Sequence, residues 1–437
     1  MSQNTYILGG GMTGLAAGVA SGLPVFEAVK SPGGICSSYY LHPQDQTRLS
    51  QPPLDGEAYR FEIGGGHWIF GGDPVVLNFI RQLTPLHTYH RRSSVYFHKQ
   101  NLYVPYPIQN NLRYLDSDIR VKALAEMSQW KQYPHTMKDW LEKNFGTTLS
   151  ELFFYPFHEL YTAGLYKKIA PQDAYKSPVN LPAVIQGAFE TVPAVGYNVS
   201  FVYPTSGLNT LAQAMAAHCD IRYGKQAVKI DVENKQLYFA NGESVSYDSL
   251  ISTLPLNKMM EITELSVEDQ PDPYTSVLVL NIGAVRGSNC PNDHWLYNFN
   301  TESGFHRVGF YSNVDPSFLP KSAQEKHNRV SIYVERSYPG GCKPSPDEIN
   351  RYAQAVIKEL QYWQFIQEVE VADPTWIDVA YTWSFPHSNW KKQALNELES
   401  YDIYAVGRYG RWVFQGIADS IRDGLFVGAA FQPKSSY

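Results

Sequence analysis

The sequence predicts an α/β fold in which a parallel, helix-covered sheet carries an inserted mixed sheet and a mainly helical insertion. Three observations lead to this expectation. A glycine-rich turn joins a short apolar strand to a helix near the start of the chain, a ribbon-like segment ends in a strand at 226–256, and another strand ends at Gly407. Strands that alternate with helices are typical of parallel sheets, so these three segments are expected to share one sheet.

The first segment, TYILGGGMTGLAAG, has the G-x-G-x-x-G spacing of a dinucleotide-binding turn. Gly9 permits the tight turn, Gly11 lets the backbone approach a pyrophosphate, and Gly14 lets the helix pack against the strand. The helix N-terminus offers free N–H groups to the phosphates. A second strand, LPVFEA, ends at Glu27, where a carboxylate can accept hydrogen bonds from a ribose. Together these features predict a Rossmann-like domain.

A second glycine pair follows directly, in the stretch SPGGICSS. Nicotinamide-binding units do not usually need glycines here, whereas flavin-binding chains often have a pair followed by a small polar residue. Gly34 and Ser37 fit that pattern. The sequence therefore favours FAD over NAD as the cofactor.

Two later segments agree with a glutathione-reductase-type FAD-binding domain. Residues 226–256 alternate like a small antiparallel ribbon, and in flavoproteins of that type such a strand supplies backbone contacts to the adenine, here near Val228. The stretch DIYAVGRYGRW reads as a strand that ends at Gly407, which would bring the last helix against the flavin.

These assignments predict a discontinuous domain organisation. The FAD-binding domain is expected to comprise 1–75, 200–262 and 395–437. Residues 76–199 are expected to form a mainly helical insertion, and 263–394 a substrate-binding sheet with helices.

Composition excludes several classes of protein. The formal net charge of −6 and the lack of a basic stripe argue against nucleic acid as a partner. No apolar run reaches the ~18 residues of a membrane span, and the N-terminus lacks the features of a signal peptide. The four scattered cysteines favour a reducing compartment and argue against a metal site. We therefore expect a cytoplasmic protein that holds no metal.

The stretch LYVPYPIQNNLRYL brings one ring and several amides together. Its prolines keep the chain extended until a helix expected near Leu112. Amide groups can read the edge of a base or sugar, so Tyr106, Gln109 and Asn110 are candidate substrate-binding residues. A polar turn before the helix is the alternative interpretation.

The stretch IGGGHWIFGG raises a similar choice. Its glycines allow the backbone to approach a flat or phosphorylated group closely. His67 is then either a functional group beside that ligand or a histidine satisfied by a neighbour in an ordinary turn.

In combination, GGHWIF and VPYPIQNN resemble UDP-galactopyranose mutase, more its eukaryotic-type branch than the short bacterial one. The resemblance continues in order through FGTTLSELFFYPFHELYTAGLYKKIAP, VYPTSGLNTL, HWLYNF, FHRVGFYSN and VGRYGRW, over almost the whole chain. It places the chain in the amine oxidase and protoporphyrinogen oxidase superfamily.

The resemblance implies an isomerase that interconverts the pyranose and furanose forms of a nucleoside-diphosphate hexose. In that family the FAD must be reduced, for which an external reductant such as NAD(P)H is a possible partner. Its N5 attacks the anomeric carbon while the nucleoside diphosphate leaves, so the flavin acts as a nucleophile that the protein orients.

The resemblance also assigns roles to residues of this chain. His67 would lie near the flavin N5, with Gly66 and Arg408 also at the flavin, and Arg307 would bind the diphosphate. His67 and Arg307 are thus the candidate catalytic residues. Phe70 and Tyr297 would contact the substrate.

Two positions depart from the mutase pattern. Where the mutases have a second diphosphate-binding arginine, this chain has QDAYKSPVNLPAV, with Lys176 and Tyr175 nearest. Where they have a phosphate-contacting tyrosine near the C-terminus, it has Phe414; Asp419 resembles a later acidic position. Lysine lacks the guanidinium fork, so the exchange puts UDP-galactose in doubt as the substrate.

Two rival functions remain open. An FAD-dependent oxidase of the amine oxidase or protoporphyrinogen oxidase type would share the fold and the N-terminal motif. A flavin-bound structural or regulatory protein would leave a polar pocket without a use. Fold alone does not decide between them, and an oligomer is possible.

Overall fold

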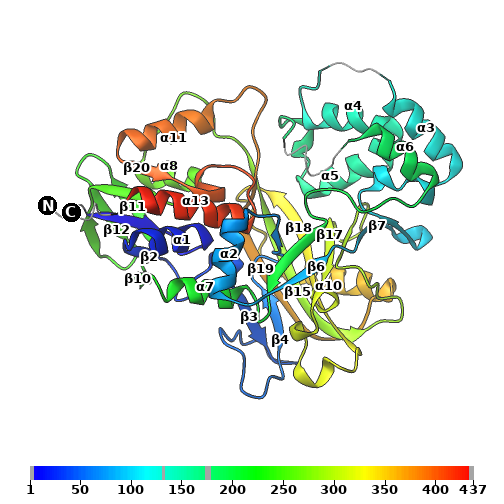
Figure 1. Ribbon diagram of the computed structural model, residues 1–437, viewed down its shortest axis with the longest axis horizontal. Helices are drawn as coiled ribbons and strands as arrows, with labels where there is room; N and C mark the ends of the chain where they lie inside the picture. The colour runs from blue at the N-terminus through cyan, green and yellow to red at the C-terminus, as the bar shows by residue number, and fades with distance from the viewer. Residues whose placement is uncertain (1–3, 130–132, 173–178, 433–437) are drawn as a thin grey trace.

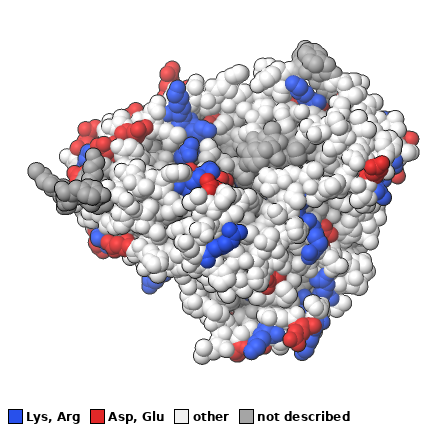
Figure 2. All heavy atoms as spheres, viewed as in Figure 1, with Lys and Arg blue, Asp and Glu red and all other residues white. Residues whose placement is uncertain are grey.

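The computed structural model describes residues 4–129, 133–172 and 179–432, which form three regions (Figure 1). A nucleotide-binding region holds both termini, a large mixed sheet lies in the middle, and a group of helices packs at the far end. The face in Figure 2 shows acidic and basic side chains interspersed. Within the described ranges, none of the helices combines the length and apolar character needed to cross a membrane.

The nucleotide-binding region contains a parallel five-stranded sheet built from the beginning, middle and end of the chain. All four pairs of neighbouring strands are parallel. The strand order is β10 (Ile221–Tyr223), β2 (Val25–Glu27), β1 (Thr5–Leu8), β14 (Ser249–Ser252) and β20 (Ile403–Ala405). The expected strands at the start, at the end of 226–256 and before Gly407 are therefore present in one sheet.

Helix α1 (Met12–Ser21) packs closely against α13 (Ile417–Ala430) because small residues line the contact. A Cβ added to Gly424 would lie 2.2 Å from the Thr13 carbonyl oxygen, and one on Gly428 would lie 2.5 Å from that of Ala17. Helix α13 therefore packs directly against α1, so the beginning and the end of the chain lie side by side. Further helices of this region are α7 (Leu208–Ala216), α8 (Leu256–Thr263) and α11 (Trp390–Ser400).

The segment 226–256 forms the expected antiparallel ribbon before it enters the parallel sheet. Its strands are β11 (Ala227–Asp231), β12 (Gln236–Phe239) and β13 (Ser244–Ser246), paired in that order.

The central sheet has seven strands and carries one wall of the site described below. Its neighbours are antiparallel except for one parallel pair, β16 with β7. The order is β19 (Ile366–Thr382), β15 (Tyr274–Arg286), β18 (Arg329–Pro339), β17 (Arg307–Phe310), β16 (Trp295–Tyr297), β7 (Ser93–Phe97) and β8 (Leu102–Pro105). One face of the sheet packs against α10 (Pro346–Tyr362), whose Tyr352, Val356 and Leu360 are buried at helical spacing.

The expected insertion 76–199 contains helices and also three strands. Strands β7 and β8 extend the central sheet, and their Val95 and Val104 are buried against the helices of this insertion. The helix expected near Leu112 begins later: Leu112–Tyr114 is a 3-10 turn, and α3 (Ser117–Met127) starts after Asp116. The other helices are α2 (Pro74–Leu83), α4 (Met137–Leu149), α5 (Tyr155–Tyr161) and α6 (Leu181–Phe189), with a π-helical turn (Ser150–Phe154) between α4 and α5.

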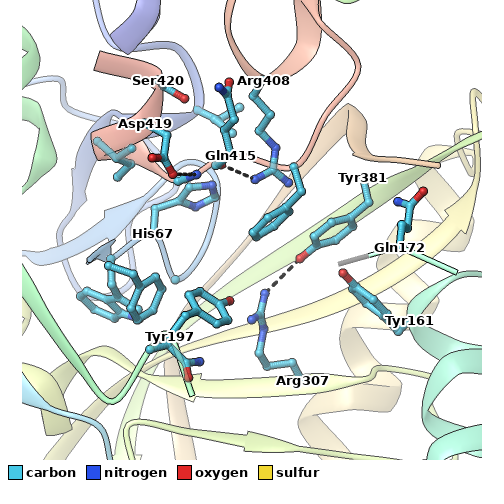
Figure 3. Close-up of a pocket in the computed structure, with 18 of the residues that line it drawn as sticks. His67, Tyr161, Gln172, Tyr197, Arg307, Tyr381, Arg408, Gln415, Asp419 and Ser420 are labelled. Atoms are coloured by element: carbon cyan, nitrogen blue, oxygen red, sulfur yellow. Dashed lines mark hydrogen bonds between the residues drawn. The ribbon is translucent and has the colours of Figure 1, made fainter. Parts of the chain in front are cut away.

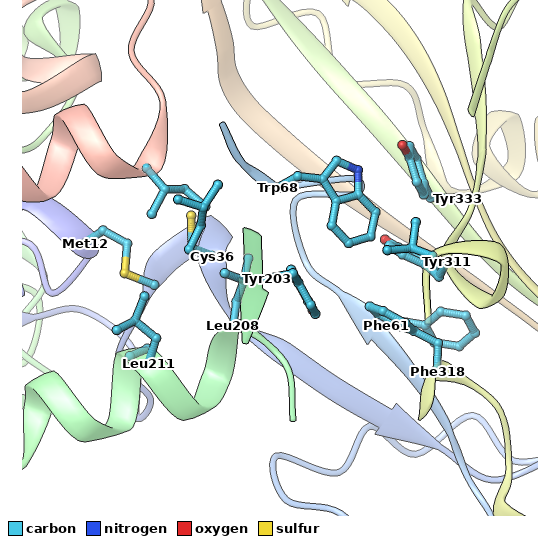
Figure 4. Packing of buried hydrophobic residues seen from close by; sticks show 14 of the residues in the cluster. Met12, Cys36, Phe61, Trp68, Tyr203, Leu208, Leu211, Tyr311, Phe318 and Tyr333 are labelled. Carbon is cyan, nitrogen blue, oxygen red and sulfur yellow. The ribbon is translucent and has the colours of Figure 1, made fainter. Parts of the chain in front are cut away.

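Two small sheets enclose the glycine-rich stretch. Strands β3 (Ser38–Leu41) and β4 (Tyr59–Glu62) form a hairpin, and β5 (Ile69–Phe70) pairs with β9 (Ser200–Pro204), which also pairs with β6 (Leu86–His90). Trp68 packs edge-on against the rings of Tyr203, Tyr311 and Phe318 (Figure 4). Packed aromatic rings therefore support the loop between β4 and β5.

Candidate functional site

A cavity of about 670 Å³ lies where the three regions meet. The β1–α1 turn and the β4–β5 loop form one end, α5 and the ends of β17 and β19 form the other, and α12 (Gly407–Gly410) with the start of α13 lies alongside. Figure 3 shows His67 and Arg408 on one side of this space and Arg307, Tyr381 and Tyr161 on the other. The cavity thus joins the nucleotide-binding turn to the central sheet.

The β1–α1 turn has the shape that a pyrophosphate requires. Gly9 adopts a φ of +100°, and a Cβ on Gly14 would lie 1.8 Å from the Gly9 carbonyl oxygen. Gly11, by contrast, faces open space: a Cβ there would meet nothing within 4 Å among the described atoms, and Gly11 lines the cavity at the N-terminus of α1. A phosphate could approach this helix end only where no side chain stands.

Glu27 is buried at the end of β2 and is held by the backbone. Its Oε2 accepts a hydrogen bond from the Gly10 N–H at 2.6 Å, and its Oε1 accepts one from the Val29 N–H at 2.9 Å. These bonds orient the carboxylate beside the turn and leave lone pairs for a ribose hydroxyl.

The second glycine pair lies against the first turn. The Gly33 N–H donates to the Gly10 carbonyl oxygen at 2.8 Å, and a Cβ on Gly34 would lie 3.6 Å from the Gly11 Cα. Ser37 is not part of the cavity lining, and its hydroxyl donates to the Pro32 carbonyl oxygen at 2.7 Å, which fixes the loop. Gly33 and Gly34 line the cavity next to Gly11.

The glycine-rich loop after β4 allows the His67 ring to fold back over its own backbone. A Cβ on Gly64 would lie 2.6 Å from His67 Cε1, and one on Gly66 would lie 2.1 Å from the Tyr333 hydroxyl oxygen. His67 lines the cavity, and its Nδ1 has no hydrogen-bond partner among the described residues. Burial and the neighbouring Arg408 charge lower the pKa of the His67 imidazole to about 4, so it is neutral at pH 7.

Arg408 is fixed along the cavity wall by backbone carbonyls. Its Nη1 donates to the Gln415 carbonyl oxygen and its Nη2 to that of Ala380, both at 3.0 Å (Figure 3). The guanidinium lies 4.6 Å from the Phe414 ring centre. Gly407, at a φ of +75°, packs against Thr13, where a Cβ would come within 2.5 Å of the hydroxyl oxygen.

Arg307 projects from the start of β17 into the other end of the cavity. Its Nε donates to Glu335 Oε2 at 2.9 Å, and its Nη2 donates to Glu335 and to the Tyr381 hydroxyl at 3.2 Å. Its Nη1 donates no hydrogen bond to a residue that the structure describes. Tyr297 is the strand partner of Arg307 in the β16–β17 pair, and its ring centre lies 4.3 Å from that of Tyr106 at a tilt of 35°.

The structure brings most of the predicted site residues to this cavity and leaves some away from its wall. The predicted residues that line it are Gly11, Gly34, Gly66, His67, Phe70, Tyr106, Tyr297, Arg307, Arg408 and Phe414. Gln109 and Asn110 are buried where the backbone of α6 comes close, and Val228 is on the exposed β11. Five further predicted residues do not line the cavity: Gly9, Gly14, Glu27, Ser37 and Gly407. The binding roles of all the predicted site residues stay predictions. Lys176 and Tyr175 lie outside the described residues.

Several lining residues were not predicted from the sequence. Tyr161, Tyr381 and Trp383 form an aromatic corner with ring centres 4.9 to 6.1 Å apart, and His306 and Gln172 lie beside it. Tyr161 lies within a stretch that resembled the mutases, so that stretch could have pointed to it. His306 lies in FHRVGFYSN, another stretch that resembles the mutases, so that stretch could have pointed to it, whereas Tyr381 stands in ordinary strand sequence and carries no local signal.

The cavity wall is rich in aromatic residues, and its charges are mainly positive. Among the described lining residues the cations are Arg307 and Arg408, and the acid is Asp419. Asp419 accepts a hydrogen bond from the Gly416 N–H and pairs with Arg422 at 3.2 Å, so its charge is shared with the start of α13. This arrangement suits an anionic ligand with a flat ring system.

Comparison with known proteins gives the family. Residues 23–432 match the family model described as flavin containing amine oxidoreductase. A crystal structure of reduced UDP-galactopyranose mutase superposes with a TM-score of 0.81 at 22% identity, covering 98% of this chain and 95% of that one.

More distant structures have the same fold. A fatty acid isomerase from P. acnes that produces CLA has a TM-score of 0.58 at 13% identity, covering 98% of this chain and 99% of that one. Putrescine oxidase bound to putrescine has a TM-score of 0.56 at 15% identity, covering 98% of both chains.

These matches confirm the predicted fold class and the predicted cofactor. The cofactor is FAD. The residues present fit it, because the open space at Gly11, the Gly33–Gly34 pair and the fixed Glu27 carboxylate provide what a dinucleotide needs. The chain belongs to the flavin-containing amine oxidoreductase family and is a flavoenzyme.

Proposed function

We propose that this flavoenzyme is a pyranose–furanose mutase that acts on a nucleoside-diphosphate hexose while its FAD is reduced. The observation that carries the proposal is the pairing of the two cavity ends: a cofactor end at Gly11 and His67, and a cationic end at Arg307. A ligand that reaches from one to the other must present its reacting carbon near the cofactor and an anionic group near Arg307.

Charge favours this ligand over an amine. The guanidinium groups of Arg307 and Arg408 line the cavity, and the one described acid in its wall, Asp419, is already paired. A cationic amine would lose hydration and meet like charge there. The solved structure of highest similarity among those above is a mutase, and we carry over its type of reaction and not its sugar.

Each residue has a role in the proposed reaction that follows from its chemistry. Bound reduced FAD would supply the nucleophile. Arg307 would stabilise the negative charge that grows on the diphosphate as it leaves, through its uncommitted Nη1. Neutral His67 can donate or accept one hydrogen bond at the cofactor end without adding charge.

The aromatic wall would limit the access of water to the cavity. This would protect a reactive sugar cation from hydrolysis. Phe153, Phe157 and Trp383 present rings and no donor atoms toward water, apart from an indole N–H that is already bonded to Thr275. The proposal also requires an external reductant such as NAD(P)H, since the cofactor must be reduced before turnover.

An FAD-dependent oxidase of the amine oxidase or protoporphyrinogen oxidase type is the second candidate. The family match supports it, and so does the aromatic wall, which would accept a large apolar ring with acidic substituents. An oxidase would consume O₂, and a mutase would not.

One anaerobic experiment separates the two. The purified yellow protein is reduced with dithionite and mixed with UDP-, GDP- and dTDP-hexoses, and products are analysed by chromatography and NMR. A furanose that forms only with reduced protein is the expected result. No conversion across the panel, together with O₂ consumption when porphyrinogens or amines are added in air, would favour the oxidase.

A further inference from the structure

One polar side chain in the cavity wall has no role in the proposed reaction. His306 directly precedes β17 and is 1% exposed, yet it lines the cavity. Its Nε2 lies 3.6 Å from Glu335 Oε2, and its Nδ1 has no hydrogen-bond partner among the described residues. A buried ring nitrogen without a partner costs about 1–3 kcal/mol, so an imidazole in this position is expected to have a partner in the bound state.

The His306 ring is held between the central sheet and α5. Its backbone N–H donates to the Glu335 carbonyl oxygen at 3.0 Å, and the ring centre lies 5.3 Å from that of Tyr161 and 6.1 Å from that of Phe157. Burial lowers the pKa of the imidazole, with Glu335 acting in the opposite direction. The neutral ring therefore carries one N–H donor and one acceptor in a fixed orientation.

His306 and Arg307 converge on the same carboxylate oxygen. His306 Nε2 lies 3.6 Å from Glu335 Oε2, the atom to which Arg307 Nε donates at 2.9 Å. Neighbouring residues in a strand usually point to opposite faces, but His306 stands just before β17 and both side chains line the cavity. Their donor groups consequently lie close enough to reach one polyoxygen anion.

We propose that His306 is a second hydrogen-bond donor to the diphosphate of the nucleotide ligand, acting beside Arg307 as part of one anion-binding subsite. This inference rests on the proposed function and refines it. Such a donor would compensate for the hydroxyl that the Phe414 position lacks, and it would act on the diphosphate and not on the base. The donor to the diphosphate would be the Nδ1–H of His306, while Glu335 would orient Arg307.

The test measures binding, which needs no turnover. The oxidised, FAD-loaded protein is titrated with UDP, UMP and uridine by flavin fluorescence or calorimetry, with GDP and dTDP as further diphosphates. His306→Phe is expected to weaken the tightest nucleoside diphosphate by about tenfold or more, the effect of one lost hydrogen bond, and to change uridine affinity less than about twofold. His306→Asn, which keeps an N–H donor, should recover most of the loss.

His294 provides a matched control. It is equally buried, at 1% exposed, and its Nε2 also lacks a partner among the described residues, but it does not line the cavity. His294→Phe should leave nucleotide affinity unchanged. FAD content and thermal unfolding are measured for each variant, and His306→Asn against His306→Ala gives the same comparison if the phenylalanine does not fit.

The outcomes distinguish a failure of the proposed anion-binding subsite from a failure of the proposed reaction. If no furanose forms but His306→Phe loses affinity for the diphosphate selectively, the proposed reaction fails and the subsite stands. If the mutase assay succeeds and His306→Phe binds the diphosphate as the parent does, the subsite is wrong. An equal loss for uridine and UDP, or no binding of any nucleoside diphosphate by the parent, would also overturn it.

Discussion

Arg307 and Glu335 face one another across β17 and β18, and Arg307 Nε donates to Glu335 Oε2 at 2.9 Å. Burial raises the pKa of the Glu335 carboxyl, but the Arg307 guanidinium and His306 together outweigh burial and hold that pKa at about 2. The carboxylate is therefore ionised at pH 7, and the arginine enters the cavity as half of an ion pair. Its orientation is fixed, and part of its charge is already neutralised.

Replacing Arg307 with alanine is expected to weaken nucleotide-sugar binding by about 2 kcal/mol or more, the scale of a charge-assisted contact. The single change also leaves the buried Glu335 charge uncompensated, which would repel a diphosphate by itself. The double variant Arg307→Ala, Glu335→Gln removes that repulsion. Flavin-fluorescence titration with the best nucleoside diphosphate measures each affinity.

Arg336 is the control for this comparison, since it is the next residue along β18 and donates to the Ser303 carbonyl oxygen outside the cavity. Arg336→Ala should bind as the parent does. Undiminished affinity in the double variant would remove Arg307 from the ligand site.

The His67→Ala variant is expected to retain FAD and to lose turnover. The ring is neutral at pH 7 because burial and Arg408 lower its pKa to about 4, so the group that acts is an imidazole and not an imidazolium. Absorbance of the bound flavin and the anaerobic assay measure the two properties. The exposed His87 on β6 offers a control, and His87→Ala should change neither. A folded His67→Ala protein without FAD would instead make His67 a cofactor-binding residue.

Replacing Gly11 or Gly14 with alanine should affect different properties: FAD affinity in the first case and stability in the second. Gly11→Ala is expected to fold as the parent does, since its Cβ meets nothing described within 4 Å, but to bind FAD at least about tenfold more weakly because the methyl group occupies the space for the pyrophosphate. Gly14→Ala would place a Cβ 1.8 Å from the Gly9 carbonyl oxygen and should lower the thermal stability of the apoprotein. FAD titration and thermal unfolding of both apoproteins distinguish these effects. Normal FAD affinity in Gly11→Ala would show that the pyrophosphate binds elsewhere.

The FAD-binding end of the site could be predicted because its signal is local. Gly9, Gly11 and Gly14 stand close together in the sequence: Gly9 has a positive φ, Gly11 borders open space and Gly14 lies against the Gly9 carbonyl, as the spacing predicts. The same holds for Gly64 and His67, which touch one another within four residues. Short-range backbone constraints of this kind produce motifs that can be recognised in a sequence.

The opposite end of the site depends on pairing between strands that are distant in the sequence, which produces no local motif. The register of β17 with β18 places Glu335 opposite Arg307, and β19 brings Tyr381 from a distant segment to the same guanidinium. No motif surrounds Glu335 or Tyr381. The helix expected near Leu112 begins later than predicted: the chain makes a 3-10 turn there, and α3 starts only after Asp116.

Glu62 gives a prediction about stability and pH. It is fully buried at the end of β4, where its carboxyl accepts hydrogen bonds from the Ser38 hydroxyl at 3.0 Å and from the Tyr203 hydroxyl. Burial raises its pKa from the usual 4.5 to about 7, although these donors and Arg60 act in the opposite direction. A raised pKa means that the folded protein holds the proton more tightly than the unfolded chain, so this group lowers stability as the pH rises from about 4.5 through 7.

The Glu62→Gln variant keeps the shape of the side chain and removes its charge. At pH 8 its free energy of unfolding should exceed that of the parent by about 3 kcal/mol, so the variant is more stable there. At pH 4.5, where the parent carboxyl is protonated, the two free energies of unfolding should be nearly the same. Denaturant titrations of the FAD-loaded proteins at several pH values between these limits measure the difference. The exposed Glu325, changed to glutamine, should follow the parent at every pH. A constant difference between Glu62→Gln and the parent across this range would mean that Glu62 does not change its protonation there.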